Sequence, residues 1–261
     1  MKVVFACPSL HRPRVKTFDY MPFIKVYVDK SEYEEYRNTD QNDGIELVAC
    51  PNGIQGNICR VRNYILDKEF ENGADMVVIV DDDMSALYYW ECDQEEKTIN
   101  KRRIRTEEIQ PLFEKYGEMC RDLGFYYMGL NCNQDKLSYR QYSPFSFSSY
   151  IGSPVMGFIR GNECRFDERL PLKEDYDMTL QQCQKYRGCL RLNFMCYDVE
   201  QAKQAGGCAT YRNLEREKEQ FEILRRKWGS KIVREDKGNS RKGNKRQFDF
   251  NPIIKIPIKG I

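Results

Sequence analysis

A strand-length run of apolar residues that ends in three acids constrains the fold of this chain more than any other feature. Met76–Val80 contains only Met, Val and Ile, and the acidic triplet Asp81, Asp82 and Asp83 follows it directly. Because the run shows no alternation of apolar and polar residues, it is typical of a strand that is buried on both faces. Such strands belong to parallel sheets that helices cover, so the sequence predicts an α/β fold.

The acidic triplet indicates a site for a cation. Like charges at the edge of an apolar core repel one another and raise at least one pKa unless a cation lies among them. Mg²⁺ and Mn²⁺ prefer carboxylate oxygens, and Mg²⁺ is commonly held by one or two carboxylates together with substrate phosphates. In open α/β sheets the ligand crevice lies outside the carboxyl ends of the strands, where this triplet falls. We therefore predict a site for a metal and a diphosphate; the alternative is a solvated loop that caps the next element.

Composition argues against several other classes of protein. The chain has 261 residues and a formal net charge of +2, so no overall field points to a polyanionic partner. Its 11 cysteines include no Cys-x-x-Cys pair and no zinc-ligand spacing, which favours reduced thiols in a cytoplasm. His11 is the only histidine, which argues against zinc hydrolase chemistry and a histidine base. We see no signal peptide and no run near the ~18 apolar residues of a membrane span, so we expect a cytoplasmic protein.

Strands and helices alternate in the first part of the chain. Strands are predicted at Lys2–Cys7, Phe23–Val28 and Ile45–Ala49. A helix is predicted over Gln55–Glu71, where apolar residues recur at helical spacing before Gly73. With the strand that precedes the acidic triplet, this alternation is typical of a doubly wound α/β fold.

Two groups of polar residues accompany these elements. The loop after the first strand contains Pro8, Ser9 and Arg12, and its hydroxyl and guanidinium are suited to a nucleotide or a phosphate. An ordinary solvated loop is the alternative. Arg62 and Asn63 lie in the first half of the predicted helix, and Arg62 falls outside its apolar stripe. We expect Arg62 to contact a diphosphate or the acidic triplet, unless it lies on a solvated helix face.

A second acidic cluster opens a later helix. Glu174, Asp175 and Asp177 lie at the start of a helical run that continues through 178–186. Acids in a first helical turn are favoured by the partial positive charge of the helix N-terminus, which is the purely structural explanation. Because three carboxylates in four positions exceed what a cap needs, we predict a catalytic role for the cluster.

Two stretches are strongly basic. Lys101–Arg105 lies in a charged excursion over 91–105, and Arg225–Arg246 contains ten Lys or Arg against two acids. Such runs are suited to polyanions, with a flexible solvated tail as the alternative. We expect residues 1–212 to form the body of the protein, and residues 213–261 to form a basic C-terminal segment that docks on it.

Residues 131–156 are rich in Ser, Tyr, Phe, Asn and Gln, which predicts a long, aromatic-lined loop of the kind that often carries binding function. Tyr139, Tyr142, Phe145 and Phe147 are candidates for stacking on an extruded base, and packing within the loop is the alternative.

Together these residues resemble the glycosyltransferases of the GT-A fold. The likeness rests on the Pro-Ser-x-x-Arg-Pro loop that begins at Pro8, on the acidic triplet, and on the acids within Lys173–Asp177. It is strongest from Pro8 to Asp83, and it is closer to the TET/JBP-associated glycosyltransferases, which are found largely in phage and thought to glycosylate hydroxymethylated pyrimidines in DNA. The resemblance implies a GT-A type, Rossmann-like sheet that is mixed and mostly parallel, flanked by helices, with a basic C-terminal extension. It also implies metal-dependent transfer of a sugar from a nucleotide sugar, with a UDP-sugar as the expected donor, to a hydroxyl.

The resemblance also implies roles on the donor side. Asp83, with Asp81 or Asp82, would hold Mn²⁺ or Mg²⁺ against the leaving diphosphate, and the remaining aspartate would bind the ribose. The residues expected at the nucleotide and its phosphates are Pro8, Ser9, Arg12, Arg62 and Asn63. Many GT-A enzymes complete the metal shell with a histidine near the C-terminus, and this chain has only His11. Water, an acid such as Asp198 or another side chain is left as the last ligand.

On the acceptor side, Asp175 would accept the proton of the attacking hydroxyl and Glu174 would orient the acceptor, provided that the reaction inverts the anomeric centre. For a DNA acceptor, Lys101–Arg105 and Arg225–Arg246 would contact phosphates. The host cytoplasm would then be the location of a phage-encoded enzyme.

Three alternatives stay open. The acceptor can be a glycan, a lipid or a protein, or the enzyme can be a nucleotidyltransferase, since aspartates at strand ends also serve nucleotide transfer. A non-catalytic nucleic-acid-binding module would explain the basic stretches, but it would leave both acidic clusters unexplained.

Overall fold

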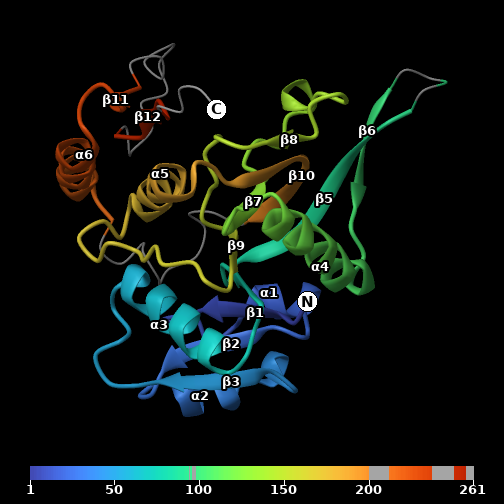
Figure 1. Ribbon diagram of the computed structural model, residues 1–261. Coiled ribbons are helices and arrows are strands. Elements are labelled where there is room, and N and C mark those ends of the chain that lie inside the picture. Colours follow the sequence, from blue (N-terminus) through green and yellow to red (C-terminus); the bar gives the residue numbers. More distant parts are fainter. Residues whose placement is uncertain (94, 96–97, 200–211, 237–249, 257–261) are drawn as a thin grey trace.

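The computed structural model describes residues 1–93, 95, 98–199, 212–236 and 250–256, and one large sheet runs through it (Figure 1). The order of the ten-stranded sheet is β3-β2-β1-β4-β9-β7-β10-β5-β6, with β8 paired to β10. Its strands are β1 (Val3–Pro8), β2 (Lys25–Asp29), β3 (Glu46–Cys50), β4 (Met76–Val80), β5 (Met84–Cys92), β6 (Ile99–Arg103), β7 (Tyr127–Asn131), β8 (Phe145–Ser146), β9 (Val155–Ile159) and β10 (Leu190–Val199).

Most of these strands point in one direction. Strands β1, β2, β3 and β4 are parallel neighbours, and β7, β10 and β6 share their direction, whereas β9, β5 and β8 run against it. The predicted mixed, mostly parallel α/β sheet is therefore confirmed.

Helices cover both faces of the sheet, as an apolar strand without alternation requires. The helices of the described residues are α1 (Lys16–Tyr20), α2 (Tyr33–Arg37), α3 (Ile58–Glu71), α4 (Thr106–Asp122), α5 (Glu174–Tyr186) and α6 (Leu214–Trp228), with 3-10 turns η1 (Asp40–Asn42) and η2 (Lys136–Ser138); α6 packs on α5 and not on the large sheet. In β4, Val78 packs in a cluster with Phe113 of α4, while its neighbour Ile79 packs in a second cluster with Ile65 of α3 and Met178 of α5. Alternate side chains of one strand thus lie in different apolar layers.

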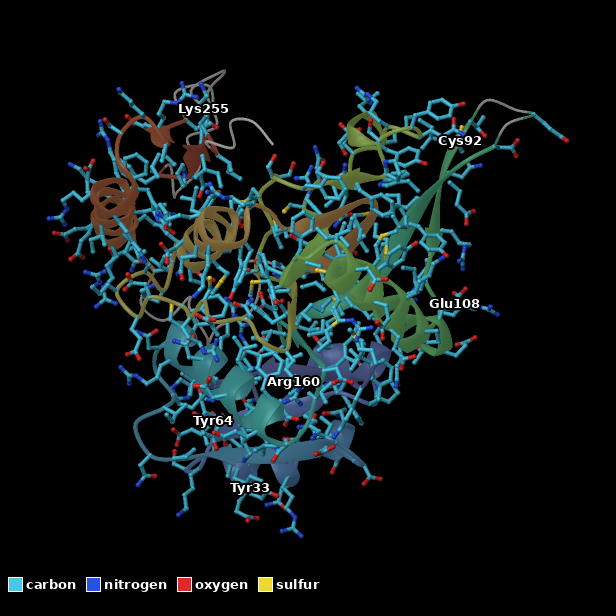
Figure 2. All side chains as sticks on the ribbon, in the orientation of Figure 1. Tyr33, Tyr64, Cys92, Glu108, Arg160 and Lys255 are labelled. Atoms are coloured by element: carbon cyan, nitrogen blue, oxygen red, sulfur yellow. The ribbon has the colours of Figure 1, made fainter. Side chains whose placement is uncertain are left out.

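The charged excursion expected over 91–105 contains a regular strand, because β5 and β6 form a long antiparallel hairpin. Cys92 marks its outer part in Figure 2. The basic side chains lie over aromatic rings of the facing strand: Lys101 Nζ is 3.9 Å from the ring centre of Tyr88, and the guanidinium carbon of Arg102 is 4.4 Å from that of Tyr89. Cross-strand cation–π contacts of this kind hold a charged strand in register.

The described part of the C-terminal segment packs beside α5. Helix α6 is followed by a two-stranded sheet of β11 (Val233–Glu235) and β12 (Pro252–Ile254), and an apolar cluster joins α6 to the α5 region. The division at residue 212 stays a prediction, and 237–246 of the basic stretch lies outside the described residues. None of the described helices has the length and apolar character needed to cross a membrane.

Candidate functional site

The loop after β1 meets the acidic triplet because β1 and β4 are parallel neighbours, so that their carboxyl ends lie side by side. Pro8 is the last residue of β1. The hydroxyl of Ser9 donates to Asp82 Oδ2 at 2.6 Å, and Arg12 Nη1 donates to Asp82 Oδ1 at 2.6 Å. Arg12 Nη1 also lies 3.8 Å from Asp83 Oδ2. The structure therefore brings Ser9 and Arg12 together with two of the three acids.

Tyr36 of α2 supports this loop, and the sequence reasoning missed it. Its side chain is fully buried, its hydroxyl lies 2.9 Å from Ser9 Oγ, and the backbone N–H of Arg12 donates to it at 3.1 Å. Burial raises the pKa of Tyr36, so its hydroxyl stays neutral. Two tyrosines, Tyr33 and Tyr36, among the charged residues of α2 are the signal that could have indicated this role.

The backbone of the triplet is fixed by Thr17 of α1. Its hydroxyl donates to the carbonyl of Asp81 at 2.5 Å and accepts from the N–H of Met84 at 3.0 Å. Because Thr17 is fully buried, the turn that carries the acids is held on the body of the protein and not left as a solvated loop.

Arg62 connects the two acidic clusters. It lies in the first half of α3 and is 2% exposed, so the alternative of a solvated helix face is wrong. One guanidinium nitrogen, Nη2, donates to Asp81 Oδ1 at 2.8 Å, and the other, Nη1, donates to Glu174 Oε1 at 2.8 Å. Of the two expected partners of Arg62, the structure shows the acidic triplet, and it adds the second cluster. Both clusters consequently belong to one site.

Burial disfavours the charged form of two carboxylates in the site. Burial raises the pKa of Asp81 to about 6, the charges of Asp83 and Asp82 add to the shift, and Arg62 opposes it. Burial raises the pKa of Glu174 to about 7, the charge of Asp175 adds to the shift, and Arg62 again opposes it. A partly dry site with raised carboxyl pKa values favours a proton or an incoming cation.

Asp175 lies beside a cavity of about 350 Å³. The hydroxyl of Tyr150 donates to Asp175 Oδ2, and the Tyr150 ring stacks on Tyr176 with ring centres 4.4 Å apart. The cavity wall is joined to the first cluster through the backbone, because the N–H of Asp81 donates to the carbonyl of Pro154 in that wall at 3.2 Å. The lining residues are Cys132, Gln134, Tyr150, Gly152, Ser153, Pro154, Asp175, Tyr197 and Val199.

The aromatic loop contributes to this cavity through residues other than those chosen from the sequence. Tyr150 is the loop's aromatic residue in the cavity wall, whereas Tyr139 packs in a cluster with Trp90 and Phe145 packs against Tyr116. Tyr142 is 89% exposed. The composition of 131–156 correctly indicated a loop at the site, but it could not indicate which ring faces Asp175.

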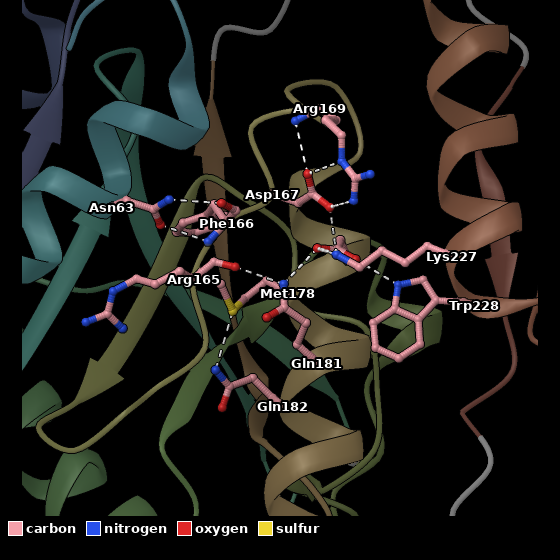
Figure 3. A network of polar contacts seen from close by, with 11 residues as sticks. Asn63, Arg165, Phe166, Asp167, Arg169, Met178, Gln181, Gln182, Lys227 and Trp228 are labelled. Carbon is pink, nitrogen blue, oxygen red and sulfur yellow. Dashed lines mark hydrogen bonds and ion pairs between the residues drawn. The ribbon is translucent and has the colours of Figure 1, made fainter.

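Two predicted site residues make contacts that serve packing. Asn63 exchanges two hydrogen bonds with the backbone of Phe166, at 2.9 and 2.8 Å, and so holds the segment before α5 (Figure 3). Asp177 is fully buried and bonds to Lys227 and Trp228 of α6. The nucleotide contact expected of Asn63 and the catalytic role expected of the second cluster stay predictions, and the contacts that the structure shows for Asn63 and Asp177 are structural ones.

Asp81 and Asp83 suit a divalent cation by their chemistry. Among the residues that the structure describes, no three or more His, Cys, Asp or Glu side chains form a group that could hold a metal ion. Asp82 is bound to Ser9 and Arg12, and Asp198 accepts from Gln134 at 3.3 Å. Since Mg²⁺ commonly needs only one or two carboxylates besides substrate phosphates, the partly buried pair of Asp81 and Asp83 fits without further protein ligands.

Comparison with known proteins places the chain in a family. The family model described as TET-Associated Glycosyltransferase matches residues 17–207, which is more than half of the chain. No curated protein matches the chain at a significant level.

Several solved structures resemble part of this chain at low sequence identity. It is similar to S. aureus TarS 1-349, with 15% identity and a TM-score of 0.46 over 76% of this chain and 59% of that one. With the complex of TarS 1-349 and UDP, the identity is 13% and the TM-score 0.46, over 86% of this chain and 64% of that one. With mannose-1-phosphate geranyltransferase from Thermus thermophilus, they are 10% and 0.44, over 76% and 75%. The chain thus spans 59% and 64% of the two TarS chains, and these likenesses carry no argument about activity. On the match over residues 17–207, the chain belongs to the TET-associated glycosyltransferase family.

Proposed function

We propose that this protein transfers a sugar from a nucleotide sugar, expected to be a UDP-sugar, to a hydroxyl of an acceptor. Membership of a glycosyltransferase family supports this activity. The observation that supports the proposal is the double contact of Arg62, which joins Asp81 of the acidic triplet to Glu174 of the second cluster.

On the donor side, we assign Asp81 and Asp83 to a bound Mn²⁺ or Mg²⁺, which when present would neutralise charge on the leaving diphosphate. Arg12 is the candidate for the phosphates, because its guanidinium lies beside the triplet at the carboxyl end of β1 and its planar fork matches phosphate oxygens. Asp82 holds Arg12 in place. Arg62 already forms ion pairs with two carboxylates. We therefore propose that it holds the two acidic clusters at a fixed distance and does not contact a phosphate.

On the acceptor side, we assign Asp175 as the general base. Its Oδ2 accepts from Tyr150 and its Oδ1 accepts from the N–H of Tyr176 at 2.8 Å, so its orientation is fixed. An ionised carboxylate has about four acceptor positions, which leaves capacity for an acceptor hydroxyl. That hydroxyl oxygen would bond to the anomeric carbon, its proton would pass to Asp175, and the diphosphate would leave with the electron pair of the broken bond. This role requires an inverting reaction.

Glu174 was expected to orient the acceptor, and its contact with Arg62 supports a different assignment. Glu174 is 7% exposed, and one of its oxygens accepts from Arg62. We therefore assign to Glu174 the task of holding the guanidinium of Arg62, which lies between the proposed donor and acceptor sides. It would therefore influence the acceptor through Arg62.

The acceptor is proposed to be the hydroxymethyl group of a modified pyrimidine in DNA, which would place the enzyme in a cytoplasm. The hairpin of β5 and β6, which carries Lys101–Arg103, supports a DNA acceptor only in part, since Arg102 pairs with Glu91 and Glu108. This pairing weakens the argument for DNA, so a glycan, lipid or protein acceptor is the second candidate. DNA binding would be salt-dependent and would weaken when Lys101 and Arg103 are neutralised; binding in a gel shift that ignores salt and both substitutions would remove the DNA acceptor.

The proposed activity is tested by two assays on the full chain. Release of UDP from UDP-glucose with Mn²⁺ separates an enzyme from a binding module, and mass spectrometry of hydroxymethylated DNA after incubation identifies the acceptor. We expect UDP release by the native protein and none by Asp83→Ala or Asp175→Ala variants that keep the native circular dichroism spectrum. Equal turnover by either variant would contradict the site assignment.

A further inference from the structure

Helix α6 contacts the start of α5 immediately before the proposed base, Asp175. Lys173 is the N-cap residue of α5 and precedes Glu174. It is 1% exposed, and its ammonium forms an ion pair with Glu217 of α6, which is 2% exposed. Arg212 lies on the other oxygen of Glu217 at 3.1 Å.

Helix α6 makes a second contact with α5 two residues after the proposed base, at Asp177. Asp177 has no exposed surface, and its Oδ1 accepts from the indole N–H of Trp228 at 2.7 Å. Its Oδ2 lies 2.9 Å from Lys227 Nζ, which also contacts Asp167 at 2.9 Å. Figure 3 shows Lys227 and Trp228 reaching from the brown helix α6 toward α5. Asp175 therefore lies between two positions that α6 holds.

A third contact fixes the chain that enters α5. The N–H of Leu172 donates to Gln220 Oε1 of α6 at 2.7 Å. Besides these polar contacts, Leu180 of α5 packs in an apolar cluster with Phe221 and Leu224 of α6. Together they restrict both translation and rotation of the first turn of α5.

Stability alone does not account for these buried charges. Removing two charges from water costs about as much as their attraction returns, and well-packed apolar pairs are often at least as stable. A fixed geometry is a different benefit, because a displacement of about 1 Å at a reacting group can lower a rate by about 10²-fold. Groups that hold a reacting residue within about 0.5 Å are those locked by packing and hydrogen bonds around it.

We propose that α6 is a positioning element of the catalytic site, which sets the direction of Asp175 through Lys173–Glu217 on one side and Asp177–Trp228 on the other. This inference rests on the proposed function, since it assigns the C-terminal segment a part in the same reaction. It gives the described part of that segment a role in catalysis that does not depend on binding a polyanion.

The test compares three variants of the full chain. The double variant Lys173→Met/Glu217→Leu removes both charges together, so that neither member of the pair is left without the other. Trp228→Phe removes the N–H that Asp177 accepts, together with part of the ring system, and it serves if the double variant does not fold. Glu163→Gln is the matched control, because its ion pair with Lys185 lies at the far end of α5 and is exposed.

Two measurements are made on each variant: UDP release from UDP-glucose with Mn²⁺, and amide hydrogen exchange over 174–179. We expect the double variant to lose about 10²-fold in kcat and Trp228→Phe about tenfold, with little change in the KM for UDP-glucose. Exchange over 174–179 should become faster in both and stay native in Glu163→Gln.

The proposal is overturned if kcat stays native while the double variant is folded, or if exchange over 174–179 is unchanged. Failure of the proposed function has a different signature. In that case the native protein releases no UDP, or Asp175→Asn turns over as fast as the native protein, while the exchange measurement still decides whether α6 orders the first turn of α5.

Discussion

Each of the two acidic clusters contains three carboxylates, but the carboxylates of the two clusters have different surroundings. In the triplet, the acids follow the end of β4 in an irregular turn and lie near Arg12 and Arg62. In the second cluster, α5 rotates successive side chains by about 100°, so that neighbouring acids face different surroundings. Glu174 faces Arg62, Asp175 faces the cavity, and Asp177 faces α6.

This difference shows that the number of acids in a short stretch of sequence does not tell how many of them lie at a functional site. A turn at a strand end can gather three carboxylates at one place, and a helix distributes them between a cavity wall, an ion pair and packing. Substitutions that separate these roles can break or sharpen the comparison.

The largest effect is expected at Asp175. Asp175→Asn removes the proposed base, whose side chain lies in the cavity wall, and loss of general base catalysis lowers kcat by about 10²–10⁴-fold. Glu163→Gln, which removes an exposed acid near the far end of the same helix, should retain native kcat. Measurement of UDP release and of transfer to the acceptor checks this prediction, and a fall of less than about threefold would show that the second cluster has no acid–base role.

Loss of Arg62 should affect stability more than loss of an exposed arginine. Arg62→Met leaves Asp81 and Glu174 without the cation between them, and removing one partner of a buried pair costs about 3–5 kcal/mol in free energy of unfolding. Arg102→Met is the matched control: Arg102 also contacts two acids but is 37% exposed, and exposed pairs contribute about 0–1 kcal/mol. Urea denaturation of both variants decides, and equal losses would show that the clusters are not coupled through a buried charge.

Glu174 should make the protein less stable as pH rises. Its pKa in the folded protein is about 7 against an ordinary value of 4.5, so between these values the folded state binds more protons than the unfolded state. The free energy of unfolding therefore falls with rising pH over this window, by a few kcal/mol at most. Glu174→Gln is neutral throughout and should flatten the slope. Urea denaturation with a chelator present, at a series of pH values, compares the two proteins; identical slopes would contradict the raised pKa.

A smaller effect is expected from narrowing the cavity. A Cβ at Gly152 would lie 2.8 Å from the Tyr197 hydroxyl and 2.9 Å from Cys132 Sγ, so both side chains must shift. Gly152→Ala should raise the acceptor KM about tenfold, the effect of about one methylene in a binding pocket, and leave the donor KM native. The reverse pattern, with only the donor KM raised, would assign the cavity to the donor sugar.

Much of the proposed donor side follows from local sequence. Unbroken Val and Ile predicted β4 and its acids at the crevice, and a parallel neighbour places Ser9 and Arg12 beside Asp82. The acceptor side depends on long-range packing. Arg62 meets Glu174 across 112 positions, and Tyr150 reaches Asp175 from a loop whose sequence follows no period. The contacts of Asp177 could be known only once the position of α6 was known. The sequence of this charged helix contains no pattern that predicts where the helix packs.

The central claim is that Asp81 and Asp83 bind a diphosphate donor in the crevice that Asp175 faces. Calorimetric titration of UDP with Mn²⁺ tests it most directly, using the native protein, Asp83→Asn and Asp175→Asn. Our account predicts binding by the native protein, loss of binding in Asp83→Asn, and near-native binding in Asp175→Asn, which acts only on the acceptor. Native affinity for UDP in Asp83→Asn, with or without Mn²⁺, would contradict it.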